Sequence, residues 1–314
     1  MTLRISTPLR LGFLALALAT ISASALAACP ELGSNIEQVL ARQPQTPVAV
    51  AVLEPSSQCT VMINAERAMT MMSVYKLPIV LAAYDAADKG FKLDRVITIT
   101  PAQAVGGYSP LAETLAEKGP QRMSYSELAD EALMESDNTA SDVLLKAIGG
   151  PEAVNRFLAR HQLSGIRVDR FERQITTDQD KLPSEVSLKD ERDTATGAAL
   201  ITLLQRLTEG KLLSARSTRI VLEKMAQVQT GRKRLRAGIP ETWKLAHKTG
   251  TGELPGGINL ATHDVGIIYA PGGRKILTAV LVGPSKLAHV EREALIAAVS
   301  KEIGKWASQT GNQP

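Results

Sequence analysis

The sequence contains little cysteine, histidine or aromatic side chain. Two of its 314 residues are cysteine, so at most one internal disulfide can form, and a disulfide-rich scaffold is excluded. The four histidines lack the His-x-His and His-Glu-x-x-His spacings of zinc sites. Aromatic residues make up 4% of the chain, and the basic run at 232–236 has no nucleic-acid-binding motif beside it. We therefore expect no metal, no cofactor and no nucleic-acid partner.

An excess of charge of one sign is also lacking, and there is only one long apolar run. That run, residues 11–28, follows Arg4 and Arg10 and ends near an Ala-Leu-Ala sequence, which is typical of a secretory signal. Its strongly apolar core is shorter than the roughly 20 residues that cross a bilayer. We predict that residues 1–28 are a signal peptide and that the protein is exported to the periplasm. Without the two arginines of this segment, the 36 basic residues fall to 34, against 32 acidic ones, which argues against a polyanionic partner.

The two cysteines leave two alternatives open. Leu26-Ala27-Ala28-Cys29 resembles a lipobox, in which Cys29 becomes the lipidated first residue of a membrane-anchored protein. Cleavage one or two residues earlier would leave Cys29 free to pair with Cys59 in an oxidising compartment. A lipid anchor at Cys29 and a Cys29–Cys59 disulfide are therefore both compatible with the sequence.

The hydropathy pattern predicts an α+β fold. Strand patterns lie near both ends of the chain and helical patterns lie between them, which predicts an antiparallel sheet of about five strands formed by both chain ends and flanked by helices. We expect residues 29–72 and 213–314 to form a discontinuous α/β domain, and residues 73–212 to form an inserted all-helical domain with a polar loop at 170–193. The predicted strands are 48–53, 59–63, 243–249, 264–269 and 276–282. The predicted helices are 74–89, 126–134, 139–148, 151–161, 194–209, 214–225 and 289–306.

Three short motifs carry the chemistry. Ser73-Val74-Tyr75-Lys76 places a hydroxyl and an amine three residues apart, on one face of a helix, where the lysine can accept or hold the serine proton. Ser136-Asp137-Asn138 follows at a predicted helix start, and Lys248-Thr249-Gly250 follows on a predicted strand. A single Ser-x-x-Lys is expected by chance roughly once in such a chain, but all three motifs in this order are not. The trio marks class A β-lactamases and penicillin-binding proteins, and the chain resembles the serine β-lactamases of class A over essentially its whole mature length.

The resemblance implies a β-lactamase/transpeptidase-like fold and a catalytic mechanism. Ser73 would attack the β-lactam carbonyl, and either Lys76 or, through a water, Glu172 would accept its proton. Ser136 would relay a proton to the departing nitrogen. Glu172 would then activate the water that releases the acyl group. Penicillin-binding proteins lack this glutamate and stay acylated.

The resemblance also assigns residues to the loop and to substrate binding. Arg170 and Asp193 would pair across the neck of the loop, and Asp137 would satisfy backbone amides at a helix start. The backbone amides of Ser73 and Thr251 would form the oxyanion hole. The residues that would bind substrate are Tyr108, Asn138, Thr176, Arg234, Lys248, Thr249, Gly250 and Thr251.

The chain departs from the family pattern in three places. Thr176 stands where many members have an asparagine that helps to hold the deacylating water, and the interval from Glu172 to Asp193 is longer than in common members. Val265 stands where many members present an arginine to the substrate carboxylate. Arg234 falls where other members supply that arginine, and a guanidinium fork suits a carboxylate. The alternative for Arg234 is an exposed member of the basic run.

We expect the mature protein to hydrolyse the β-lactam amide of penicillins or cephalosporins, to confer antibiotic resistance, and to act as a monomer without a protein partner. Two alternatives share its motifs. One is a D-Ala-D-Ala peptidase acting on peptidoglycan, and the other is an inactive β-lactam-binding sensor.

Overall fold

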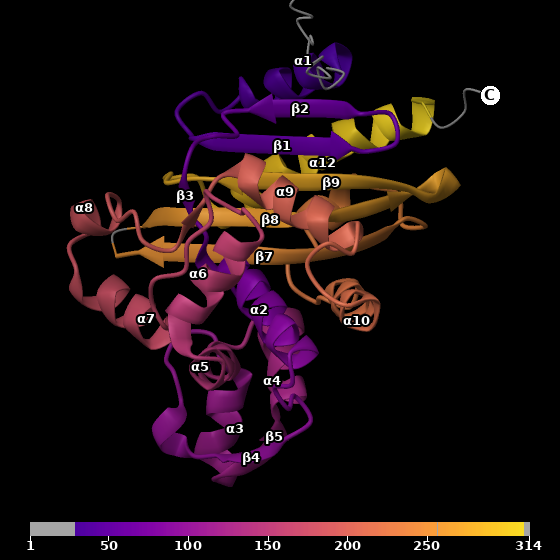
Figure 1. Ribbon diagram of the computed structural model, residues 1–314. Coiled ribbons are helices and arrows are strands. Elements are labelled where there is room, and N and C mark those ends of the chain that lie inside the picture. The colour runs from indigo at the N-terminus through magenta and orange to yellow at the C-terminus, as the bar shows by residue number, and fades with distance from the viewer. Residues whose placement is uncertain (1–28, 256, 311–314) are drawn as a thin grey trace, which may run out of the picture.

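The computed structural model describes residues 29–255 and 257–310. Five strands form one antiparallel sheet in the order β2-β1-β9-β8-β7 (Figure 1), which confirms the predicted sheet built from both ends of the chain. The predicted signal peptide, residues 1–28, lies outside the described residues. The strands are β1 (Val48–Glu54), β2 (Cys59–Ile63), β7 (Lys244–Leu254), β8 (Ile258–Ala270) and β9 (Arg274–Val282).

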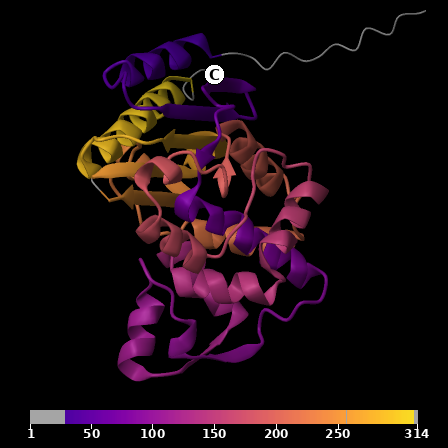
Figure 2. The same ribbon diagram turned by 90° about the vertical axis from the view of Figure 1, so that its left-hand side faces the viewer.

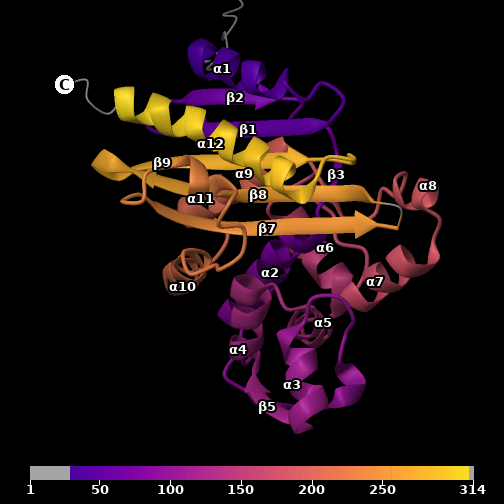
Figure 3. The ribbon, with the colours of Figure 1, turned by 180° about the vertical axis from the view of Figure 1, so that it is seen from behind.

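Helices cover both faces of this sheet. Every residue of β1 is buried, because successive side chains of a strand point to opposite faces and each face has a core of its own. Val50 packs in the core shared with α1 (Pro30–Leu40) and α12 (His289–Thr310). Ala51 faces α9 (Gly197–Thr208) on the other side (Figures 1 and 3).

Most of the remaining helices extend beyond the β7 edge of the sheet (Figures 1 and 2). The central one, α2 (Lys76–Asp88), is buried continuously from its first residue to Asp85. Pro78 lies in its first turn, where the backbone N–H would have no helical partner. The others are α3 (Pro110–Lys118), α4 (Tyr125–Asp130), α5 (Asn138–Ala147), α6 (Gly150–Arg160), α7 (Glu172–Lys181) and α10 (Ala215–Met225). The short helix α8 (Ser184–Ser187) lies past the ends of the strands (Figure 1), and α11 (Leu235–Gly238) packs beside α12 on the face of the sheet (Figure 3).

The inserted region is not all-helical, in contrast to the prediction. Strands β4 (Val96–Ile99) and β5 (Gln121–Ser124) pair with each other, and β3 (Met69–Thr70) pairs with β6 (Thr194–Ala195). These strands have two to four residues each, too few to give a strand pattern. Helix α9 also packs on the central sheet. The predicted domain boundary at 212/213 therefore places α9 in the inserted domain, although it packs with the α/β domain.

The polar loop predicted at 170–193 contains α7 and α8. Its side chains are mostly polar, so the loop shows no apolar stripe that would reveal helices. The start of α7 is marked by a capping contact instead. Gln174 Oε1 accepts a hydrogen bond from the backbone N–H of Phe171 at 3.0 Å. The segment therefore consists largely of two short helices and is not an irregular loop.

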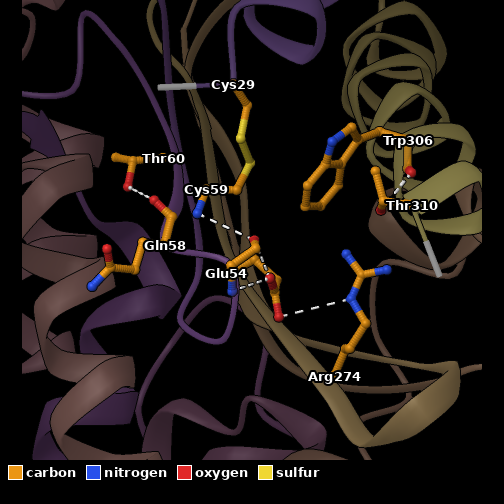
Figure 4. The surroundings of a disulfide bond; sticks show 9 residues. Cys29, Glu54, Gln58, Cys59, Thr60, Arg274, Trp306 and Thr310 are labelled. Carbon is orange, nitrogen blue, oxygen red and sulfur yellow. Dashed lines mark hydrogen bonds and ion pairs between the residues drawn. A yellow bond between two sulfur atoms is a disulfide. The ribbon is translucent and has the colours of Figure 1, made fainter. Parts of the chain in front are cut away.

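The described chain begins at a disulfide. Cys29, directly before α1, is joined to Cys59, the first residue of β2, with 5.4 Å between their Cα atoms (Figure 4). Nearby, Arg274 of β9 lies 3.8 Å from Glu54 and stacks over the Trp306 ring of α12. Both terminal helices are thus attached to this part of the sheet. No helix in the described part of the chain is long and apolar enough to cross a membrane.

Candidate active site

The site lies where the edge strand β7 meets the start of the helical region. The 3-10 turn η1 (Met72–Tyr75) carries Ser73 and leads directly into α2, whose first residue is Lys76. The backbone N–H of Met71 donates to Asp193 O at 2.8 Å, which fixes the chain just before the turn. The serine and the lysine therefore share one rigid helical start, as their spacing predicts.

The Lys76 ammonium group is fully buried and lies among four oxygen atoms. Its Nζ donates to Ser73 Oγ at 3.0 Å, to Ser136 O at 2.9 Å and to Asn138 Oδ1 at 2.7 Å. It also lies 2.6 Å from Glu172 Oε1. A buried ammonium requires a counter-charge and hydrogen-bond acceptors, and these residues provide both. Lys76 therefore joins the candidate nucleophile to the candidate base.

The Ser136-Asp137-Asn138 motif forms a sharp turn between the π-helical turn η3 (Glu131–Glu135) and α5. Ser136 has a φ of 64°, in the left-handed region that such side chains rarely adopt. Asp137 holds the turn by accepting hydrogen bonds from the N–H groups of Ala140 at 2.8 Å and Leu111 at 2.7 Å. The structure therefore places Asp137 as a helix cap and turns Ser136 toward the site.

Lys248 of β7 reaches Ser136 from the opposite side. Its Nζ donates to Ser136 Oγ at 2.8 Å and to Thr249 O at 3.0 Å. Burial, followed by the positive charge of Lys76, holds the pKa of Lys248 well below its ordinary value. A lysine with a lowered pKa can exchange a proton with a neighbouring hydroxyl, so Ser136 lies between two amines.

The contact between β7 and η1 depends on Gly250. A Cβ atom at this position would lie 2.5 Å from Met71 O, so no larger residue fits without separating the two segments. Thr249 Oγ1 shares a 2.6 Å hydrogen bond with Thr230 Oγ1. Thr251, the residue after Gly250 on β7, is exposed and lies at the rim of the site.

Glu172 is the first residue of α7, and Asp142 of α5, which the sequence reasoning missed, holds it there. Asp142 accepts hydrogen bonds from the backbone N–H groups of Glu172 at 2.6 Å and Arg173 at 3.1 Å. Burial raises the pKa of Asp142 to about 6, against the two N–H bonds, which lower it. Asp142 lies four residues after Asn138, a spacing that puts both on one helix face and could have indicated its position.

Arg170 closes the neck of the 170–193 segment. Its Nε donates to Asp193 Oδ2 at 2.7 Å, and its Nη1 donates to Asp178 at 2.7 Å and Asp190 at 3.0 Å. Arg170 and Asp193 are both buried. The structure thus brings together the pair that the resemblance implied and adds two further carboxylates.

Tyr108 and Thr176 lie at the entrance. Tyr108 is 57% exposed, and its carbonyl oxygen accepts from the Asn138 N–H at 3.1 Å. Thr176 Oγ1 donates to Glu172 O at 2.9 Å, so its hydrogen is taken by its own helix and only its oxygen remains to accept a bond. A Cβ atom on Gly107 would lie 3.3 Å from the Thr176 methyl group, which shows how narrow the entrance is here.

Arg234 is buried, whereas Arg232 and Lys233 beside it are exposed. The alternative of a solvated member of the basic run is therefore wrong for Arg234. Its Nη2 donates to Thr251 Oγ1 at 2.7 Å, which places the guanidinium beside the rim of the site. Within the described residues, no group of three or more His, Cys, Asp or Glu side chains is placed to hold a metal ion.

Comparison with known proteins identifies the family of the chain. A family model described as "Beta-lactamase enzyme family" matches residues 31–307. β-Lactamase VEB-1 of Pseudomonas aeruginosa is 31% identical over 271 residues, covering 85% of this chain and 87% of that protein. The extended-spectrum β-lactamase PER-1 of the same organism is 30% identical over 276 residues, covering 87% and 86%. The crystal structure of a class A β-lactamase from Bacteroides cellulosilyticus superposes with a TM-score of 0.78 at 26% identity, covering 87% of this chain and 97% of that one. The chain therefore belongs to the class A β-lactamases, a family of serine hydrolases.

Proposed function

We propose that the protein hydrolyses β-lactams through an acyl-Ser73 intermediate, which water activated by Glu172 then releases. One observation carries this proposal. The buried Lys76 ammonium group contacts both Ser73 Oγ, at 3.0 Å, and Glu172 Oε1, at 2.6 Å. A nucleophile with an amine and a carboxylate beside it can be deprotonated for acylation and can be freed by a base afterwards.

In acylation, Ser73 Oγ bonds to the lactam carbonyl carbon and the C–N bond of the ring breaks. The serine proton passes through a water to the Glu172 carboxylate, or passes to Lys76 Nζ after the Lys76 ammonium group has given one of its own protons to Glu172, 2.6 Å away. Ser136 gives a proton to the departing nitrogen, and the Lys248 ammonium group, 2.8 Å from Ser136 Oγ, replaces it. The backbone N–H groups of Ser73 and Thr251 stabilise the negative carbonyl oxygen.

In deacylation, water adds to the ester carbon and Glu172 takes a proton from it. The ester C–O bond breaks, Ser73 Oγ recovers its proton, and the ring-opened acid leaves. Glu172 suits this role because Asp142 and Lys76 fix its backbone and its carboxylate.

Substrate binding uses both walls of the site. Asn138 receives the side-chain amide, and Tyr108 borders the entrance. The substrate carboxylate lies against Lys248, Thr249 and Thr251, with Arg234 beside them, because cationic and hydroxyl donors suit a carboxylate. Gly250 allows β7 to approach Ser73.

The test is turnover of a chromogenic cephalosporin over many enzyme equivalents. We expect continued colour formation, abolished by Ser73→Ala. A single stoichiometric burst would indicate a D-Ala-D-Ala peptidase instead, and binding without colour would indicate an inactive sensor.

We also propose that the enzyme is exported to the periplasm after removal of residues 1–28. The sequence of this segment and the Cys29–Cys59 disulfide support an oxidising compartment. Fractionation of cells that express the full chain tests this, because activity in the cytoplasmic fraction alone would contradict it.

A further inference from the structure

A second cavity, of about 780 Å³, lies in the helical region against the start of α7. It is enclosed by α5, the first residues of α7, strand β4 and the 3-10 turn η2 (Pro101–Gln103), and α5 and α7 lie side by side (Figure 1). Among the described residues that line it, none is assigned to catalysis or to β-lactam binding. A cavity of this size accepts a small organic molecule.

Much of the wall of this cavity is aromatic or aliphatic. The apolar side chains are those of Ile97, Tyr125, Val143, Ala147 and Phe171. Val143 is buried and the other four are half-buried, so part of their apolar surface stays in contact with water. A flat aromatic ring placed among them would remove that surface from water, which is favourable.

Two cations line the same cavity. Lys146 lies in the last turn of α5 and Arg173 in the first turn of α7, and neither has a carboxylate within ion-pair distance in residues 29–255 and 257–310. Arg173 Nη2 donates to Ala102 O at 3.3 Å and to Ala104 O at 2.9 Å. Its Nε and Nη1 hydrogens have no acceptor in that part of the chain, so the guanidinium can still donate.

Two glutamine amides add further donors. Gln103 Oε1 accepts a hydrogen bond from the Thr100 N–H at 3.0 Å, and Gln174 Oε1 accepts one from the Phe171 N–H at 3.0 Å. Because a backbone N–H fixes each oxygen, the NH2 end of each amide is the end left without a partner among the described residues. Both glutamines line the cavity.

Asp142 is the one carboxylate among the described residues that line the cavity. Its Oδ1 accepts from the Glu172 N–H and its Oδ2 from the Arg173 N–H, so both oxygens are already bonded to α7. Two cations therefore face one carboxylate, and the side-chain groups still able to bond are mainly N–H donors. Such a cavity suits an anion.

From these contacts we propose that the cavity is a second binding site, separate from the catalytic one, for an aromatic carboxylate. The ring lies among the apolar side chains. The carboxylate accepts hydrogen bonds from Lys146, Arg173 and the two glutamine amides. A hydrated inorganic anion would satisfy the donors but would leave the apolar wall in contact with water, so the ring and the charge are both required.

The ligand also acts on the catalytic centre, because the cavity and the centre share the start of α7. Asp142 and Arg173 line the cavity, and Asp142 holds the backbone of Glu172. The ligand carboxylate binds Arg173 and repels the Asp142 carboxylate, which weakens the hold on Glu172. This coupling rests on the proposed function, whereas the binding itself does not.

Calorimetric titration with 2-naphthoate tests the binding. We expect one saturable site with a Kd of about 1 mM or lower, and 2-naphthamide, which has the same ring without the charge, should bind at least about tenfold more weakly. Lys146→Met should weaken 2-naphthoate binding about tenfold. Lys118→Met is the matched control, because Lys118 is an exposed lysine in the last turn of α3 that does not line the cavity. Equal binding of the acid and the amide, or an unchanged Kd in Lys146→Met, would overturn the proposal.

A variant that fills the cavity tests the place of the ring. Ala147→Phe puts a ring into the cavity and should abolish 2-naphthoate binding, with kcat and KM unchanged in the absence of the ligand. If Ala147→Phe does not fold, Ala147→Leu must weaken binding in the same direction. Binding that survives the substitution would place the ligand elsewhere. Inorganic phosphate that displaces 2-naphthoate at an equal concentration would show a simple anion site and would also contradict the proposal.

Steady-state hydrolysis of a chromogenic cephalosporin separates this cavity from the active site, which also accepts carboxylates. Saturating 2-naphthoate should lower kcat about fivefold and change KM less than about twofold. A rise in KM alone would show that 2-naphthoate competes for the active site, which would overturn the proposal. Binding without any change in kcat would refute the coupling to Glu172. Absence of turnover by the wild type would refute the proposed function and leave the binding tests standing.

Discussion

Glu172 and Lys76 face each other across 2.6 Å in a buried site, which makes Glu172 the most informative residue to alter. Glu172→Gln keeps an oxygen that can accept from Lys76 but cannot take a proton from water. We expect deacylation to slow by roughly 10²–10⁴-fold, so that an acyl-enzyme adduct persists in mass spectra while acylation continues. Glu185→Gln, on the exposed face of α8, should behave as the wild type. Unchanged turnover in Glu172→Gln would contradict the assignment of the base.

Asp142 gives a prediction for stability against pH. Its pKa is raised to about 6 by burial, with the charge of Glu172 opposing ionisation and that of Lys76 favouring it. The folded protein therefore holds this proton more tightly than the unfolded chain, so the contribution is present at low pH and is lost as the pH rises through about 6. Asp142→Asn does not titrate. The free energy of unfolding of the wild type, relative to Asp142→Asn, should rise by about 1 kcal/mol between pH 7 and pH 5. Urea unfolding at the two pH values measures it, and a fall would refute the sign.

At this scale the sequence predicted the residues whose types and order form a motif. Ser73, Lys76 and Lys248 were identified in this way. Asp142 was not, because it acts through a contact between segments far apart in the chain. Asp142 meets a backbone N–H 30 residues away. No local spacing encodes such a pairing.

At the scale of elements, the 170–193 segment depends on one arginine. Arg170 is buried against Asp193, Asp178 and Asp190, and removing one partner of a buried ion pair leaves uncompensated charge. Arg170→Ala should lower the free energy of unfolding by roughly 3 kcal/mol. It should also slow deacylation more than acylation, because α7 carries Glu172. Urea unfolding and rapid-quench mass spectrometry measure the two effects.

The matched control for Arg170 is Arg167→Ala. Arg167 pairs with Asp169 at 2.7 Å, but its side chain is 54% exposed, so the loss should stay within about 1 kcal/mol. Equal effects of the two substitutions would mean that the neck does not depend on burial of Arg170.

The elements whose presence the sequence predicted are those with a long apolar pattern, such as the three C-terminal strands, although β7 and β8 are longer than the predicted ranges 243–249 and 264–269. Helices α1 and α3 were missed although each has a start signal. Pro30 is the first residue of α1, two residues after the end of the apolar run that was assigned to the export signal. Ser109 caps α3, with its hydroxyl accepting from the Ala112 N–H, and Pro110 follows it. A capping residue predicts a helix only together with a helical hydropathy pattern after it.

At the scale of the whole molecule, the sheet separates the disulfide from the active site. β2, which begins at Cys59, and β7, which carries Lys248, are the opposite edge strands. The distribution of apolar residues predicted a sheet built from both chain ends. The continuous apolar run of β1 is typical of a strand buried on both faces, but such a run cannot be told from a buried helix segment by periodicity alone, so it did not by itself predict the two cores on opposite faces of β1.

The disulfide lies at the edge of the sheet away from the active site, so it should affect stability and not turnover. Cys29 and Cys59 close a loop of 30 residues, and cross-linking a loop of this length stabilises a fold by roughly 3–4 kcal/mol. Cys59→Ser should therefore lower Tm, and dithiothreitol should lower the Tm of the wild type but not that of Cys59→Ser. Turnover at 25 °C should be unchanged, because Ser73 lies by the other edge. The intact mass of the mature wild type should be that of an unmodified chain less two hydrogens. A mass increased by acyl chains, together with a Cys59 thiol that reacts with a maleimide, would show a lipid anchor at Cys29 and exclude the disulfide.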